Sequence, residues 1–186
     1  DDLEAAASLF AEHGDRIAAV LTEPVQGAGG VHPPVDGYLE GLRRLCDDNG
    51  ALLIFDEVIC GFGRTGKAFA AQSFGVTPDI ITMAKALTNG ALPMGAVAVD
   101  DEIYDTVVNA APENAIELFH GYTFSGHPTA CAAGLAALEI YEKENLFERA
   151  AELSPYFLDQ VYSLQDLNAV TDIRGYGLIA GFDVAT

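Results

Sequence analysis

Four short apolar runs recur along the chain, and stretches of helical or loop character separate them. Each run has the length of a buried strand, and together they cover residues 17–21, 51–55, 79–84 and 95–99. Residues 36–49 follow a 3.6-residue apolar period and stop before Gly50, a common end to a helix. Strands that alternate with helices favour a mostly parallel sheet with helices on both faces, so we predict an α/β fold.

The pattern changes after His127. Residues 129–144 and about 146–163 predict two helices, and residues 169–173 and 177–182 predict a strand pair. We therefore expect residues 1–140 to be part of a large domain and residues 141–186 to begin a smaller α+β domain.

The charge balance excludes several classes of partner. Nine basic residues oppose 28 acidic ones, giving a net charge of −19, which argues against nucleic acid and anionic membrane surfaces. No apolar run reaches the length of a membrane span. The three cysteines form no CxxC pair, which favours reduced, mostly buried thiols and a cytoplasmic location.

Two carboxylates, Asp56 and Glu57, directly follow the second apolar run. Functional groups of open α/β sheets gather at the carboxyl ends of the strands, which makes Asp56 a candidate site residue. A role as a helix cap or turn residue fits its position equally well.

Lys85 follows the third apolar run and is one of only three lysines in the chain. Apolar surroundings would disfavour its ammonium form and make a neutral amine available as a nucleophile. A lysine that reaches from a strand end into solvent is the structural alternative. The combination of Lys85 with Asp56 on another strand end favours a cofactor that needs an imine partner and an anion beside a ring nitrogen.

Residues 61–66 (GFGRTG) match the G-x-G-x-x-G pattern of dinucleotide-binding proteins. In that fold the strand leads directly into the first glycine, and an acidic residue follows about twenty positions later. Here five residues intervene, and position 83 is methionine. We therefore interpret the glycines as a tight loop beside the site, and a nucleotide-binding module remains an alternative.

The remaining polar candidates are less specific. The four histidines lack metal-ligand spacing, so we predict no metal site and a structural role for each. The hydroxyls of residues 122–125 could cap the following helix or bind a phosphate, and the local sequence favours the cap.

Taken together, these motifs resemble the class III aminotransferases that depend on pyridoxal 5'-phosphate. The resemblance spans about residues 17–182 and rests on DEV at 56–58, GFGRTG at 61–66, PD at 78–79, AK at 84–85 and TNG at 88–90. EPVQG at 23–27 and HGYTF at 120–124 match flanking motifs of the family in the same order.

The resemblance implies fold type I, with a seven-stranded large domain, a smaller C-terminal domain and a homodimer or higher assembly. Lys85 would hold the cofactor as a Schiff base and then shuttle a proton. Asp56 would pair with the pyridinium nitrogen, Val58 would pack on the ring, and Thr123 would bind the phosphate of the neighbouring subunit's site.

The branch is indicated by residues 88–97 and 119–123, which look most like the ω-amino acid–pyruvate (β-alanine–pyruvate) aminotransferases. Ornithine-type relatives carry Glu and Gln where this chain has Ala28 and Ile59. We therefore expect an ω-amino acid or amine as donor and a 2-oxo acid, pyruvate, as acceptor. Another class III enzyme, such as an aminomutase or a racemase, is the nearest alternative.

Members of the family are considerably longer than this chain. The resemblance implies that a phosphate cup, a stacking aromatic residue and a substrate-binding arginine lie in segments that are absent here. Arg174 lies upstream of that arginine, so we predict a structural role for it. We expect the chain to be part of a longer protein and to be inactive alone.

Overall fold

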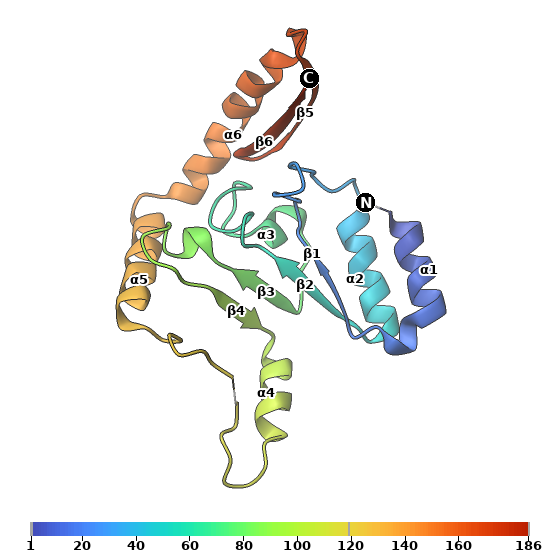
Figure 1. Ribbon diagram of the computed structural model, residues 1–186, viewed down its shortest axis with the longest axis vertical. Helices are drawn as coiled ribbons and strands as arrows, with labels where there is room; N and C mark the ends of the chain where they lie inside the picture. The colour runs from blue at the N-terminus through green and yellow to red at the C-terminus, as the bar shows by residue number, and fades with distance from the viewer. Residues whose placement is uncertain (1, 119, 186) are drawn as a thin grey trace.

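The computed structural model describes residues 2–118 and 120–185 and contains a central four-stranded sheet (Figure 1). The strand order is β1 (Ala19–Thr22), β2 (Leu52–Asp56), β3 (Ile80–Met83) and β4 (Ala96–Val99). The first three strands are parallel, and β4 is antiparallel to β3. The mostly parallel α/β sheet is therefore confirmed. The link from β3 to β4 holds only the 3-10 helix η2 (Lys85–Leu87), which is too short for a parallel crossover.

Helices pack on one face of this sheet and enclose the main core. This face belongs to Leu53 and Phe55, which are fully buried. Both contact the cluster formed with α1 (Leu3–His13) and α2 (Tyr38–Asn49). The predicted stop of α2 is confirmed, since Gly50 has a φ of 66° and its amide donates to the carbonyls of the last turn.

The opposite face of the sheet is only partly covered by the described residues. Leu21 of β1 and Val97 of β4 are 65% and 61% exposed. The register brings Leu21, Ile54, Ile80 and Val99 into one row across this face. The helices expected on both faces thus cover the part of one face around Leu53 and Phe55 and leave the other face incompletely covered within this part of the chain.

Two helices had no counterpart in the sequence prediction. The first, α3 (Ala70–Phe74), has five residues, and a distant carboxylate holds its first turn. The second, α4 (Asp101–Asn109), begins at Asp100, whose side chain accepts from the amide of Glu102.

The C-terminal elements follow the prediction closely. They are α5 (Pro128–Lys143), α6 (Leu146–Tyr162), the short η3 (Ser163–Asp166) and an antiparallel hairpin of β5 (Val170–Tyr176) and β6 (Ile179–Val184). Asn145, with a φ of 48°, separates α5 from α6. Figure 1 shows α6 and the hairpin together at one end of the molecule, and α4 at the other. Within the described residues, no helix is long and apolar enough to cross a bilayer.

Candidate active site

Asp56 ends β2 and lies beside Thr82 of β3 in the parallel register. One carboxylate oxygen, Oδ1, accepts from the Thr82 hydroxyl at 3.1 Å and from the Val58 amide at 3.0 Å. Both bonds use the same oxygen, so Oδ2 has no hydrogen-bond partner among the described residues. Asp56 is therefore fixed in position but retains one oxygen that can accept from a ligand.

Lys85 begins η2, three residues after Thr82, at the same carboxyl edge of the sheet as Asp56. Its side chain is exposed in this chain, so the apolar surroundings expected from the sequence do not enclose it. The reason is local: the apolar neighbours lie along β3, whereas Lys85 stands in the turn that follows. Its φ of 44° lies in the left-handed region, which lysine seldom adopts.

Glu57, next to Asp56, has a different environment and is fully buried. Its two carboxylate oxygens accept from the amides of Ala70 and Ala71 at 2.8 and 2.7 Å, which holds the first turn of α3. Its own amide donates to the Thr82 carbonyl at 3.0 Å. Burial raises the pKa of the Glu57 carboxyl, and the two amide bonds partly offset that rise. The sequence placed a carboxylate at this edge, but it gave no sign that Asp56 would be half-buried with a free oxygen and Glu57 fully buried with both oxygens bonded.

The other two residues assigned to the cofactor lie at different depths. Val58 is half-buried beside Asp56, whereas Thr123 is exposed. Thr123 belongs to a turn in which the Tyr122 amide donates to the Ser125 hydroxyl at 2.8 Å. The preferred interpretation of these hydroxyls as caps of α5 is wrong, because His127 is the cap residue and no side chain bonds there. Pro128 opens that helix instead. Phe119 lies outside the described residues.

The glycine loop, residues 61–66, forms consecutive turns as predicted. Its glycines pack against other segments of the chain. A side chain at Gly63 would meet Phe147 of α6, and one at Gly66 would meet the backbone of Ala151. The Arg64 carbonyl accepts from the Leu178 amide at 2.7 Å. We call this contact of the loop with α6 and the β5–β6 hairpin the glycine seam. Because packing uses these glycines, the loop does not support the nucleotide-binding alternative.

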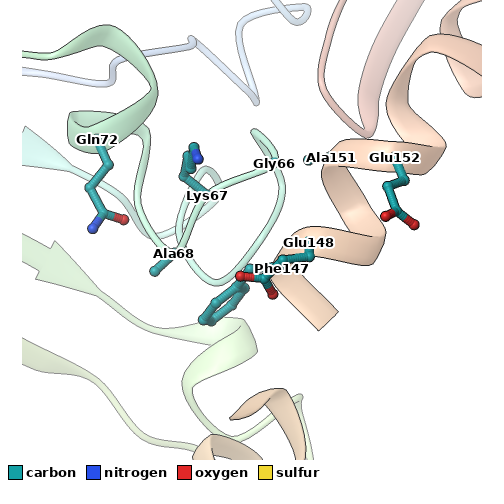
Figure 2. Close-up of a pocket in the computed structure, with 8 residues that line it drawn as sticks. All are labelled: Gly66, Lys67, Ala68, Gln72, Phe147, Glu148, Ala151 and Glu152. Carbon is teal, nitrogen blue, oxygen red and sulfur yellow. The ribbon is translucent and has the colours of Figure 1, made fainter. Parts of the chain in front are cut away.

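A pocket of about 430 Å³ lies along the glycine seam. Figure 2 shows that residues 66–68 and Gln72 line one side and α6 lines the other, with Phe147 extending toward the loop. Its lining includes neither Asp56 nor Lys85, so this pocket is separate from the carboxyl edge of β2 and β3.

Ile59 packs against Gly27, the residue that precedes Ala28 in the chain. The loop that contains Gly27 and Ala28 is held by Glu23, whose side chain accepts from the Gly27 amide at 3.0 Å. The neighbouring Cys60 thiol is buried and donates to the Val25 carbonyl, and burial raises its pKa to about 12.

Arg174 on β5 ties the same loop to the C-terminal hairpin. Its Nε donates to the Gly30 carbonyl at 2.9 Å, and its other nitrogens pair with Asp172 and with both oxygens of Asp183. These bonds raise the pKa of Arg174 and lower that of Asp183. The contacts support the structural role predicted for Arg174.

No group of metal-binding side chains occurs among residues 2–118 and 120–185. The three cysteines are free, and Cys46 and Cys60 are buried, as expected.

The residues at the carboxyl edge suit a pyridine-type cofactor. Asp56 has a free, negatively charged oxygen for a protonated ring nitrogen, and Lys85 has an accessible amine for a carbonyl carbon. Val58 adds an apolar side chain beside Asp56. This set of groups differs from a nucleotide site, which would need free backbone amides at a glycine turn.

Comparison with known proteins shows the family of this chain. Residues 2–186 match the family model "Aminotransferase class-III". The chain is 55% identical over 184 residues to an omega-aminotransferase of Caulobacter vibrioides, covering 99% of the chain and 41% of that relative. It is 54% identical over 170 residues to a beta-alanine–pyruvate aminotransferase of Pseudomonas aeruginosa, covering 91% of the chain and 38% of that relative.

Solved structures give the same result. An (S)-enantioselective omega-transaminase from Thermomicrobium roseum superposes with a TM-score of 0.90 at 44% identity, covering 98% of the chain and 40% of that structure. The chain thus spans about two fifths of the length of the relatives that it matches.

Proposed function

Because this chain belongs to the class-III aminotransferase family, we propose that it is the catalytic middle of a pyridoxal-phosphate-dependent transaminase. The observation that carries the proposal is the geometry of two adjacent parallel strands. Asp56 ends β2 with one oxygen free, and its register partner on β3 is Thr82. Lys85 follows three residues after Thr82.

Each side chain at this edge has a defined task in the proposed reaction. Thr82 and the Val58 amide hold Asp56, whose carboxylate would pair with a protonated ring nitrogen of the cofactor. Lys85 Nζ would hold the cofactor through its carbonyl carbon and would carry a proton to and from the substrate carbon. When bound, the cofactor supplies a ring that withdraws electrons and stabilises negative charge at that carbon.

We propose an ω-amino acid or amine, such as β-alanine, as donor and pyruvate as acceptor. Two relatives above 50% identity support this choice by their names, omega-aminotransferase and beta-alanine–pyruvate aminotransferase. Ala28 and Ile59, which packs against Gly27, themselves offer no polar group to a second amino group of a diamino acid.

We propose a homodimer in which Thr123, exposed in this chain, binds the phosphate in the neighbouring subunit's site. We place the domain boundary at residues 140–141, near the end of α5 (Pro128–Lys143) and a few residues before Asn145, which separates α5 from α6. Free, buried cysteines are consistent with a cytoplasmic location.

The test is a transaminase assay on the full-length protein that contains this chain, loaded with pyridoxal phosphate. We expect alanine to form from β-alanine and pyruvate, and we expect Lys85→Ala to lower the rate at least about a thousandfold. Lys67→Ala, at an exposed lysine of the glycine-loop region, is the matched control and should leave the rate unchanged. A wild-type protein that transfers no amino group from any ω-amine tested would contradict the proposal.

A further inference from the structure

The turn that carries Lys85 has an unusual backbone. Lys85 and Asn89 have φ values of 44° and 50°, in a region where side chains are unfavourable. Amides of residues 87–91 donate to carbonyls of the same turn, and the buried Thr88 hydroxyl donates to the Leu92 carbonyl at 2.6 Å. These bonds are local, so they fix the shape of the turn and leave its placement relative to the rest of the fold to other contacts.

One side chain from a distant element bonds the backbone of this turn. The Tyr141 hydroxyl, on α5, donates to the carbonyl of Ala86 at 2.7 Å. Ala86 directly follows Lys85, and Tyr141 lies 55 positions later in the chain. Among the described residues, it is the only side chain outside residues 84–92 that donates to the backbone of η2.

The ring of Tyr141 stacks on two other aromatic rings. It stacks on Phe62 of the glycine loop, with centroids 5.9 Å apart, and on Phe147 of α6, with centroids 5.4 Å apart. Phe62 in turn contacts Phe69, with centroids 5.3 Å apart. Figure 2 shows Phe147 reaching from α6 toward the glycine loop. The two flanking rings therefore restrict the direction in which the hydroxyl points.

The hydroxyl also remains a donor at working pH. Burial raises the pKa of Tyr141, and the nearby Arg64 only partly offsets that rise. A tyrosine with a raised pKa keeps its proton at neutral and mildly alkaline pH, where aminotransferase chemistry would take place.

We propose that Tyr141 is a positioning residue for Lys85: its stacked ring aims a hydroxyl at the Ala86 carbonyl and fixes the turn from which the lysine extends. The inference rests on the proposed function, because it gives Lys85 a reaction for which its position matters. Through the hydrogen bond of Tyr141 to Ala86, α5 contributes a residue to the carboxyl edge of β2 and β3. Tyr141 also links that edge to the glycine seam, since Phe62 and Phe147, which stack on its ring, lie at the seam.

The test compares three variants of the full-length protein. Tyr141→Phe keeps the ring and removes the hydroxyl. Phe147→Leu removes a stacking partner and keeps the hydroxyl. Tyr156→Phe removes a hydroxyl from a tyrosine of α6 that is 63% exposed and serves as the matched control. The readouts are amide hydrogen exchange over residues 85–91 of the cofactor-free protein, kcat and KM with β-alanine and pyruvate, and the melting temperature.

We expect Tyr141→Phe to speed exchange in residues 85–91 about fivefold and to lower kcat about fivefold, because one hydrogen bond is lost. KM should stay within about twofold and the melting temperature within about 2 °C of wild type. Phe147→Leu should lower the melting temperature further but kcat less than Tyr141→Phe, and Tyr156→Phe should match wild type.

Wild-type exchange and kcat in Tyr141→Phe would overturn the inference. An equal loss of kcat in Phe147→Leu would also overturn it, because general packing would then explain the effect. A wild-type protein without transaminase activity would instead contradict the proposed function. The exchange of residues 85–91 would in that case still decide whether the Tyr141 hydroxyl orders the Lys85 turn.

Discussion

The carboxyl edge of β2 and β3 and the glycine seam are built in opposite ways. At the edge, Asp56 is half-buried with a free oxygen, and Lys85 is exposed. At the seam, glycines leave room for Phe147 and Ala151, and the Arg64 carbonyl is bonded to the hairpin. The G-x-G-x-x-G motif, which is typical of nucleotide binding, thus serves packing here. Asp56 and Lys85, the groups suited to chemistry, lie at or just after strand ends and are accessible to a ligand.

The comparison predicts that changes at the edge affect rate and that changes at the seam affect stability. In Asp56→Asn the bonds from Thr82 and Val58 can persist, but the charge that pairs with a protonated ring nitrogen is lost. We expect the transamination rate to fall about a thousandfold, with a melting temperature within about 2 °C of wild type. Steady-state kinetics and calorimetry on the full-length protein would measure both. A rate within tenfold of wild type would remove Asp56 from the site.

Gly177 tests the seam, because a side chain there would collide with the backbone of Arg64 and Thr65. Gly177→Ala combines this collision with an unfavourable φ of 62°, so we expect a loss of about 3 kcal/mol in unfolding free energy. Gly75→Ala is the matched control, since Gly75 has a φ of 66° and open space around it, and it should cost only about 1 kcal/mol. Equal losses in denaturant titrations would show that the seam contributes nothing beyond the backbone conformation.

The neighbours Asp56 and Glu57 differ in the same way as the two regions: Asp56 has a free oxygen, whereas Glu57 stabilises the fold by holding α3. Glu57→Gln replaces an acceptor oxygen by an amide nitrogen, so one of the amides of Ala70 and Ala71 loses its bond. We expect a loss of about 2 kcal/mol in unfolding free energy. The rate below the melting temperature should fall far less than in Asp56→Asn. If Glu57→Gln is as stable as wild type but as slow as Asp56→Asn, the division of roles between the two carboxylates is wrong.

The smallest expected effect concerns the ion pair of Arg174 with Asp183. Arg174 lowers the pKa of Asp183 below its ordinary value of 3.8, so pairing favours the folded state when the carboxyl is ionised. The contribution is therefore fully present above pH 3.8 and is lost as the pH falls through the lowered pKa. Asp183→Asn should melt slightly below wild type at pH 7, and the difference should shrink below pH 3.8. A difference that stays constant from pH 7 to strongly acidic solution would argue against this pair.

Much of the fold could be predicted because its signals are local. The apolar runs gave β1 to β4 within two residues at each end, and Gly50 marked the end of α2. The direction of β4 could not be predicted, because an apolar run carries no direction. The helix α3 was missed because the carboxylate that holds its first turn comes from Glu57, 13 positions earlier. In contrast, Asp100 before α4 was an available capping signal.

The site was predictable to the extent that its residues follow strands. Asp56 and Lys85 both stand at the predicted carboxyl edge. Their surroundings were not predictable, since the exposure of Lys85 and the burial of Glu57 depend on which distant elements cover each residue. The contact of Tyr141 with Ala86 likewise joins residues 55 positions apart and leaves no local pattern.

The central claim is that Lys85 anchors the cofactor, and one measurement tests it directly. The full-length protein is incubated with pyridoxal phosphate, reduced with borohydride and digested, and the labelled peptide is mapped by mass spectrometry. The chain offers three lysines, at positions 67, 85 and 143, so the label can discriminate among them. We predict that the label lies on Lys85. A label on Lys67 or Lys143, or on no lysine of this chain, would contradict the account.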